Sequence, residues 1–134
     1  MTLMDEFDSN ALLVKAKELN RLISKIAKRA EYNYYKYPTL NQLVRSANSV
    51  YANGAELHKF LTAKFRYSKM NISYGEARES LTHCVCLNFD GVITDEELEQ
   101  LNELLTEITK IQQKSLSTLA FAVSREKGKG KNDE

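Results

Sequence analysis

The sequence predicts an all-helical protein that folds as one antiparallel, up-down-up-down four-helix bundle. In four segments, apolar residues recur every three or four positions, which is the spacing of one face of an α-helix. Breakers are scarce, with five Gly and one Pro in 134 residues, so the helices are expected to be long. The connections are short, which favours antiparallel neighbours packed about 20° from parallel around one core.

Length and composition are typical of a single globular domain. The chain has 43% hydrophobic and 28% charged residues. Its start, MTLMDEFDSN, lacks the features of a secretory signal, and no stretch approaches the roughly 20 apolar residues that span a bilayer. We therefore expect a cytoplasmic protein that has no membrane partner. The bundle domain is expected over residues 10–124, between a disordered or frayed segment 1–9 and a disordered charged tail 125–134.

The first helix is expected over about residues 10–35. Asp8 or Ser9 can cap its start, and Pro38 disfavours helical geometry at Tyr37 and so limits its end. The positions that share its apolar face are Leu12, Leu13, Ala16, Leu19, Leu22, Ile23, Ile26 and Ala30.

The second helix is expected from Thr39 to about residue 57, because Thr39 and Gln42 have the spacing of a capping box. Its predicted core face consists of Leu40, Leu43, Val44, Ala47, Val50, Tyr51 and Gly54. The opposite face is a compact polar stripe of Gln42, Arg45, Ser49, Asn53 and Glu56. This stripe is either ordinary exposed surface or, because short side chains permit close helix approach, part of an interface between helices or subunits.

The third helix is expected over residues 62–89 and is apolar on two sides. Its predicted core face consists of Ala63, Tyr67, Met70, Tyr74, Ala77, Leu81, Cys84, Val85 and Asn88. The reverse face carries Phe65, Ile72, His83, Cys86 and Leu87. A helix that is apolar on two sides must bury both, and in so small a protein this indicates a partner subunit.

The fourth helix is expected to follow a clear stop signal. Asp90 and Gly91 form that signal, and Thr94 with Glu97 has the spacing of a capping box. The core seam of this helix is predicted to be Leu98, Leu101, Leu105, Ile108, Ile111, Leu119 and Val123.

No pattern in the chain indicates an enzyme. His83, Cys84 and Cys86 are residue types that bind metals, but helical residues two apart point about 200° away from each other, and no second Cys or His pair exists. Cys84 is instead expected in the core and Cys86 at an interface. Glu76 and Glu79 could do acid–base chemistry in principle, but helical carboxylates are usually solvated. We expect no catalysis, no metal and no cofactor.

The net charge of +1 hides a strong asymmetry along the chain. Residues 15–69 carry twelve Lys or Arg and three acids, a net charge of +9, whereas residues 70–109 carry one Arg and nine acids, a net charge of −8. Cations interleaved with tyrosine rings suit a phosphate backbone and unpaired bases, although a merely solvated face has the same composition. The nucleic-acid-binding candidates are Lys15, Lys25, Lys28, Arg29, Lys36, Lys59, Lys64, Arg66, Lys69, Tyr34 and Tyr35.

The spacing Gln42-x2-Arg45-x3-Ser49-x3-Asn53-x2-Glu56, followed by Gly75 and Glu79, then by Asp90-Gly91 and Thr94-Asp95-Glu96-Glu97, resembles the 23S rRNA intervening-sequence protein family of bacterial four-helix bundles. The match is ungapped from Leu12 to Leu119. Together with the two-sided third helix, it gives these candidates for an interface between subunits: Gln42, Arg45, Ser49, Asn53, Glu56, Phe65, Ile72, Glu79, Cys86 and Leu87.

The resemblance implies a homopentameric ring without known enzymatic activity. A related bundle is the accessory variability determinant of diversity-generating retroelements, which resembles a basic pentamer that binds a reverse transcriptase and nucleic acid. We therefore expect a self-associating scaffold that binds RNA or DNA, with structured RNA as the favoured ligand. The alternative is a protein-interaction adaptor, such as an accessory subunit of a reverse transcriptase.

Overall fold

A computed structural model describes residues 1–31, 37–59 and 62–132, with the side chains of all these residues except residue 58 and residues 129–132. Over these ranges the chain is all-helical, which confirms the predicted class, and no strand occurs in them. The elements are α1 (Leu3–Ser9), α2 (Ala11–Arg29), α3 (Pro38–Ala55), the short 3-10 helix η1 (Glu56–Lys59), α4 (Ala63–Phe89) and α5 (Asp95–Asn132).

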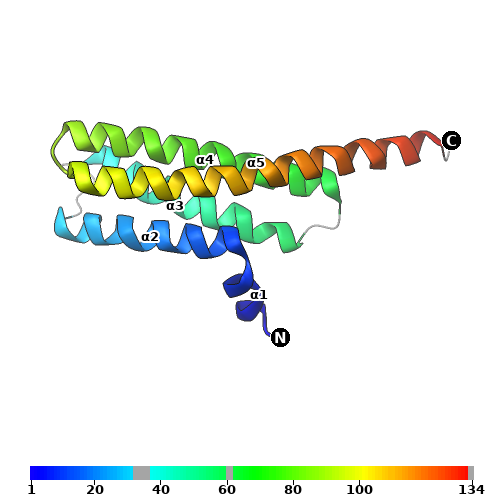
Figure 1. Cartoon of the computed structure of the whole chain (residues 1–134), viewed down its shortest axis with the longest axis horizontal. Helices are drawn as coiled ribbons and strands as arrows, with labels where there is room; N and C mark the ends of the chain where they lie inside the picture. The colour runs from blue at the N-terminus through cyan, green and yellow to red at the C-terminus, as the bar shows by residue number, and fades with distance from the viewer. Residues whose placement is uncertain (32–36, 60–61, 133–134) are drawn as a thin grey trace.

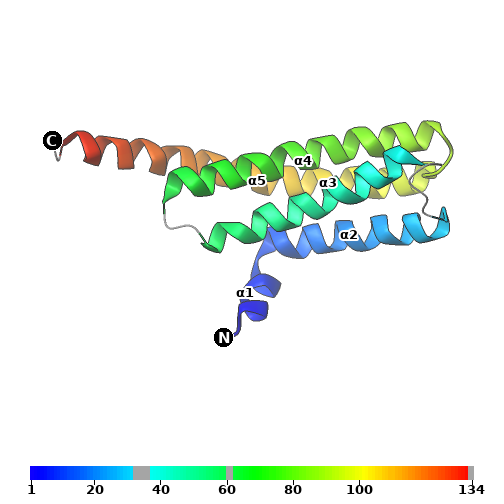
Figure 2. The same ribbon diagram turned by 180° about the vertical axis from the view of Figure 1, so that it is seen from behind.

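Helices α2, α3, α4 and α5 lie side by side, and each runs opposite to the one before it (Figures 1 and 2). α2 contacts α3 and α5, and α4 contacts the same two helices. We call these four helices the helical body. α1 points away from it, and the last turns of α5 extend beyond it (Figure 1). In the described part of the chain, no helix is both long and apolar enough to cross a membrane.

The core lies between the four helices of the body and is built from the apolar positions that the sequence pattern selected. On α2 the buried residues follow the predicted face. On α3 the predicted face is buried as well, with Val44 and Tyr51 partly covered. The largest side chains that are fully enclosed include Leu13, Leu19, Ile23, Ile26, Leu40, Leu43, Leu101, Leu105 and Ile108.

The segment before α2 differs from the expectation of a disordered or frayed end. Residues 3–9 form α1, because Thr2 and Asp5 make a capping box. The backbone N–H of Thr2 donates to Asp5 at 2.8 Å, and the N–H of Asp5 donates to the Thr2 hydroxyl at 3.1 Å. An aspartate in place of the usual glutamate hid this signal.

The cap of α2 also differs from the prediction. Neither Asp8 nor Ser9 caps it; the side chain of Asn10 accepts a hydrogen bond of 3.1 Å from the N–H of Leu13. The helix ends at Arg29 rather than near residue 35, and Glu31 has a φ of 51°. A left-handed residue at this point ends an α-helix.

The capping box predicted for Thr39 and Gln42 is wrong. α3 begins one residue earlier, with Pro38 in its first turn, and the side chain of its N-cap residue, Tyr37, does not cap the helix. Proline has a φ suited to the first helical turn and no N–H that needs a partner, so it can start a helix without a side-chain cap.

The limits of α4 agree with the prediction, but its buried face does not. Thr62 caps the start, and Gly91, with a φ of 76°, follows the end. Leu87, predicted on the reverse face, is 1% exposed and lies in the core, whereas Tyr67 and Val85, predicted in the core, are 36% and 37% exposed.

Two buried serines explain which side of α4 packs against α3. The Ser80 hydroxyl lies 2.8 Å from the Ser46 hydroxyl of α3, and Ser73 donates to the carbonyl of Val50 at 2.8 Å. Both α4 serines are fully buried. Their small volume lets α3 and α4 approach closely, which a search for apolar periodicity does not detect.

The start of α5 confirms the prediction, and its end corrects one. Thr94 and Glu97 make both hydrogen bonds of a capping box, at 3.0 and 3.1 Å. Residues 125–134 were expected to be disordered, yet α5 continues to Asn132. Glu126 accepts a hydrogen bond of 2.9 Å from the N–H of Ala63, so this extension also caps the start of α4.

Candidate nucleic-acid interface

Three exposed cations form a stripe along the second half of α2. Arg21, Lys25 and Lys28 are exposed, and their spacing of four and three residues places them on one side of the helix. Within the described residues, none of the three makes an ion pair. We call these residues the α2 stripe. Arg21 was missed in the sequence, although the same spacing could have revealed it.

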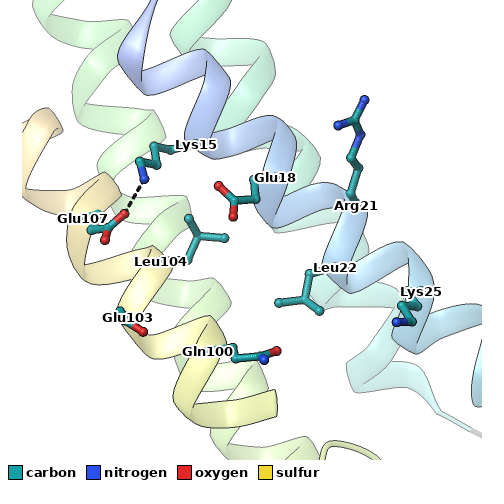
Figure 3. Close-up of a pocket in the computed structure, with 9 residues that line it drawn as sticks. All are labelled: Lys15, Glu18, Arg21, Leu22, Lys25, Gln100, Glu103, Leu104 and Glu107. Carbon is teal, nitrogen blue, oxygen red and sulfur yellow. Dashed lines mark ion pairs between the residues drawn. The ribbon is translucent and has the colours of Figure 1, made fainter. Parts of the chain in front are cut away.

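Arg21 and Lys25 of the α2 stripe line a groove of about 540 Å³ between α2 and α5 (Figure 3). α2 contributes three cations and the acid Glu18 to the lining of this groove, and α5 contributes the acids Glu103 and Glu107. Figure 3 shows the Lys15 ammonium turned toward Glu107, and their ion pair measures 2.7 Å. The pKa of Lys15 is raised, and the largest cause is its hydrogen bond to Glu107. Lys15 therefore connects two helices, and a phosphate would have to compete with Glu107 for it.

Arg29 has a similar structural role at the end of α2. Its guanidinium donates to both carboxylate oxygens of Glu97, at 2.6 and 2.8 Å, and to the carbonyl of Val92 at 2.9 Å. A bidentate arrangement of this kind is among the stronger side-chain contacts in proteins. Arg29 thus holds the start of α5 against α2.

The remaining described candidates gather at η1 and the start of α4. Lys59, Lys64 and Arg66 are exposed, and we call them the α4 patch. Lys69, one turn further along, makes an ion pair of 2.8 Å with Glu56. That contact, foremost through its hydrogen bond, lowers the pKa of Glu56.

The α2 stripe and the α4 patch lie toward opposite ends of the helical body. α2 ends at the side of the body where α3 begins, whereas α4 starts at the other side (Figure 1). The 19 residues of α2 correspond to roughly 28 Å at about 1.5 Å per residue. The α2 stripe and the α4 patch of one chain are therefore two separate groups of cations. Lys36, Tyr34 and Tyr35 lie outside the described residues.

The residues predicted for an interface between subunits come together on α3 and α4. The ion pair between Glu56 and Lys69 joins the two helices at one end of this face. The side chain of Asn53 donates to the hydroxyl and carbonyl of Ser49, at 2.8 and 2.9 Å, and so stays on α3. Gln42 and Arg45 are exposed. The two helices thus present a shared outer surface.

Carboxylates of α4 lie close to the polar stripe of α3. Glu79 lies 3.3 Å from the ring of His83, one helical turn away. Burial, the charge of Glu79 and a hydrogen bond to it raise the pKa of Glu76, while the charges of Arg45 and His83 act in the opposite direction. The polar stripe of α3 and the acids of α4 therefore form one electrostatic group.

The apolar candidates on α4 divide into exposed and buried residues. Phe65 and Ile72 are 56% and 43% exposed, and Cys86 is exposed as well. Leu87 instead belongs to the core. Burial raises the pKa of the Cys84 thiol to about 12, which suits its predicted core position.

Gly75 lies one turn from Ile72 and is exposed in the middle of α4. A Cβ atom placed on Gly75 would meet no atom within 4 Å, so nothing in its own chain requires the glycine. A mid-helix glycine costs roughly 1 kcal/mol relative to alanine. Close approach of another backbone at this point is one reason to keep it.

No group of three His, Cys, Asp or Glu side chains that could hold a metal ion occurs in the described part of the chain.

Comparisons with known proteins agree with the resemblance seen in the sequence. The sequence profile of a family described as 23S rRNA-intervening sequence protein matches residues 9–114. A crystal structure of a protein with unknown function from the S23 ribosomal protein family of Bacteroides thetaiotaomicron VPI-5482 is similar in fold, with a TM-score of 0.63 and 23% identity over 76% of this chain and 97% of that chain. None of the curated proteins compared with the chain matches it. Because the profile covers most of its length, this chain belongs to the 23S rRNA-intervening sequence protein family.

Proposed function

We propose that the protein is a non-catalytic, homo-oligomeric four-helix-bundle scaffold that associates with nucleic acid, with structured RNA as the ligand. The observation that carries the proposal is the α2 stripe, Arg21, Lys25 and Lys28. Its three cations are exposed, lie on one side of a helix and make no ion pair within the described residues. Phosphate backbones bind to such rows of cations by releasing condensed counterions.

Oligomerisation explains how two separate groups of cations could act together. In one chain the α2 stripe and the α4 patch are too far apart to form one surface. In a ring, copies repeat both groups, so the positive potential sums over subunits. We place the contact between subunits on the α3–α4 face, with the exposed Ile72 and Phe65, and expect five copies, as the family resemblance implies.

Salt-dependent RNA binding tests the nucleic-acid part of the proposal. A gel shift with a structured RNA at 50 and 200 mM salt should give a much weaker affinity at the higher concentration. Arg21→Gln/Lys25→Gln/Lys28→Gln should lower the slope of log K against log salt by about 0.7–0.9 for each phosphate that the variant no longer neutralises.

The matched control removes the same charge from other parts of the chain. Arg78→Gln/Lys110→Gln/Arg125→Gln also replaces three exposed cations, but these lie on α4 and α5. It should keep most of the salt dependence. No affinity at low salt, an equal decrease in both triple variants, or an affinity indifferent to salt would overturn the RNA proposal.

Light scattering tests the assembly. Ile72→Asp should shift the protein toward the monomer, because it adds a charge to the proposed interface. The control is Val85→Asp, a similarly exposed position on the same helix that lies about 220° further round it. A wild-type protein that stays monomeric at micromolar concentration would refute self-association.

Gene context separates the scaffold from the adaptor hypothesis. A position inside an rRNA operon supports the scaffold. A reverse-transcriptase gene with a template repeat next to it would favour an accessory subunit of that enzyme instead.

A further inference from the structure

At the end of the helical body where α2 begins, no described helix continues the line of α2 alongside α4 and α5. α4 and α5 continue past this point (Figure 1). A groove of about 460 Å³ lies there, and an adjoining one of about 440 Å³ shares part of its lining and reaches Asn10. We call this surface the open corner. It is defined by Leu57, Arg66, Ile111, Lys114, Ser115 and Leu119.

The lining of the open corner is apolar and basic. Leu57 and Ile111 are half-buried and Leu119 is 9% exposed, so they provide an apolar floor. Arg66 and Lys114 supply two cations, and neither groove is lined by an acidic residue. A suitable occupant is therefore a short amphipathic helix that carries negative charge.

A straight extension of α2 could not fill the open corner. At 100° per residue, helix continued through Asn10 would turn Asp5 and Asp8 toward the core line of α2, and would turn Leu3 and Phe7 to the opposite side. Burying carboxylates against apolar residues is costly. The chain instead leaves the helix at Asn10, which has a φ of −85° and a ψ of 117°.

α1 consequently carries apolar side chains that its own chain leaves uncovered. Leu3 and Met4 are 61% and 58% exposed. Phe7 packs edge-on against Tyr51 of α3, with ring centroids 6.5 Å apart, so it holds α1 to its own body. A helix of seven residues is too short to be stable in water without such tertiary contacts.

We propose that the open corner of one chain receives α1 of a second copy of the same chain. The proposal rests on the self-association proposed above. Leu3 and Met4 would cover the apolar floor, while Glu6, a first-turn acid of α1, would face Lys114 and Arg66. Arg66 would then belong to this contact, and the α4 patch would keep Lys59 and Lys64. With Phe7 still held on Tyr51, this exposed end of α1 is free to meet a neighbouring molecule.

The dimensions agree as well. The seven residues of α1 span about 10 Å, and the stretch of α5 from residue 111 to residue 119 spans about 12 Å, at 1.5 Å per residue. Each copy offers one α1 and one open corner, so the contact can close a dimer or continue around a ring.

Cross-linking between two differently substituted chains tests the contact. In a Cys86→Ser background, Met4→Cys protein is mixed with Ser115→Cys protein and oxidised with copper phenanthroline. A disulfide between these two residues must join two chains, so we expect a dimer on a non-reducing gel that neither protein forms by itself. The control replaces Ser115→Cys with Gln113→Cys, an exposed position two residues away that points to a different side of α5.

Absence of the mixed dimer, or equal yields with Ser115→Cys and Gln113→Cys, would overturn the proposal. So would a chain carrying both Met4→Cys and Ser115→Cys that closes its disulfide only within itself, because α1 would then fill its own corner. Charge reversal adds a second readout: Lys114→Glu should abolish most of the cross-link, and Glu6→Lys on the partner chain, which leaves the capping box of α1 intact, should restore it.

The same proteins separate this contact from the wider function. If they scatter light as oligomers and shift RNA but give no mixed dimer, only the α1 contact is wrong. If they are monomeric at every concentration, self-association and the α1 contact are both wrong, and RNA binding is judged by the gel shift.

Discussion

Arg29, in the last turn of α2, donates hydrogen bonds of 2.6 and 2.8 Å to the two carboxylate oxygens of Glu97, in the first turn of α5. Glu97 also accepts a bond of 3.0 Å from the N–H of Thr94. One carboxylate thus caps α5 and joins it to α2. The pKa of Glu97 is lowered from 4.5 to about 2, and the largest cause is the hydrogen bonding from Arg29.

This contact should make stability depend on pH. The folded-state pKa of Glu97 lies below the unfolded value, so the unfolded chain binds more protons between them. The contribution is complete above about pH 5 and is lost as the pH falls toward 2. Because Arg29 is half-exposed, we expect about 1–2 kcal/mol. The free energy of unfolding is measured with urea at pH 7, 5 and 3. Glu97→Gln should be less stable than the wild-type protein at pH 7, and its free energy of unfolding should fall less as the pH is lowered. Glu99→Gln is the control, and a pH dependence unchanged in Glu97→Gln would contradict the assignment.

Truncation to alanine should lower the stability of the protein at Leu87 but hardly at Ile72. Leu87→Ala removes a core side chain and should lower the free energy of unfolding by about 2–4 kcal/mol. Ile72→Ala removes an exposed one and should change the free energy of unfolding by less than about 0.5 kcal/mol in dilute protein. Denaturant curves measure both. A small effect of Leu87→Ala on the free energy of unfolding would instead indicate that Leu87 lies on the reverse face of α4.

The buried amide of Gln112 should contribute little to stability. Its Nε2 donates to the Ser73 hydroxyl at 2.9 Å, but its Oε1 has no partner within the described residues. We expect Gln112→Met to be neutral or stabilising by up to about 1 kcal/mol, and Ser73→Ala, which leaves Nε2 unpaired, to cost about 1–2 kcal/mol. The double variant should recover most of that stability. Additive effects in this double-mutant cycle would show that the two side chains are not coupled.

The cap of α2 can be assigned by two alanine substitutions. Asn10→Ala should cost about 1 kcal/mol, because it removes the acceptor for the N–H of Leu13. Ser9→Ala should have almost no effect on the free energy of unfolding. Thermal unfolding followed by circular dichroism measures both, and the reverse order would favour the cap expected from the sequence.

The helix limits that local chemistry specifies were predictable. Thr62 caps α4 and Thr94 with Glu97 caps α5, because a capping side chain and its N–H partner lie within three residues of each other. Where two local signals competed, prediction failed: Pro38 began α3 before the expected capping box, and Asn10 capped α2 in place of its neighbours.

The candidate surfaces were less predictable, since they depend on which residues of distant segments meet. Lys15, Arg29 and Lys69 look equivalent to Lys25 in the sequence, yet each has a carboxylate partner from another helix. The charge count could show an excess of cations, but the arrangement of the helices pairs some of them with acids and leaves the α2 stripe and the α4 patch apart.

The sequence by itself determined the all-helical class, both limits of α4, the start of α5 and the core faces of α2, α3 and α5, because hydrogen bonds within a helix and apolar spacing are local properties. Tertiary structure decided which side of α4 is buried, which cations stay exposed and where a corner remains open. These outcomes depend on close contacts between helices, such as that of Ser46 with Ser80, whose energies are set only when the helices pack together.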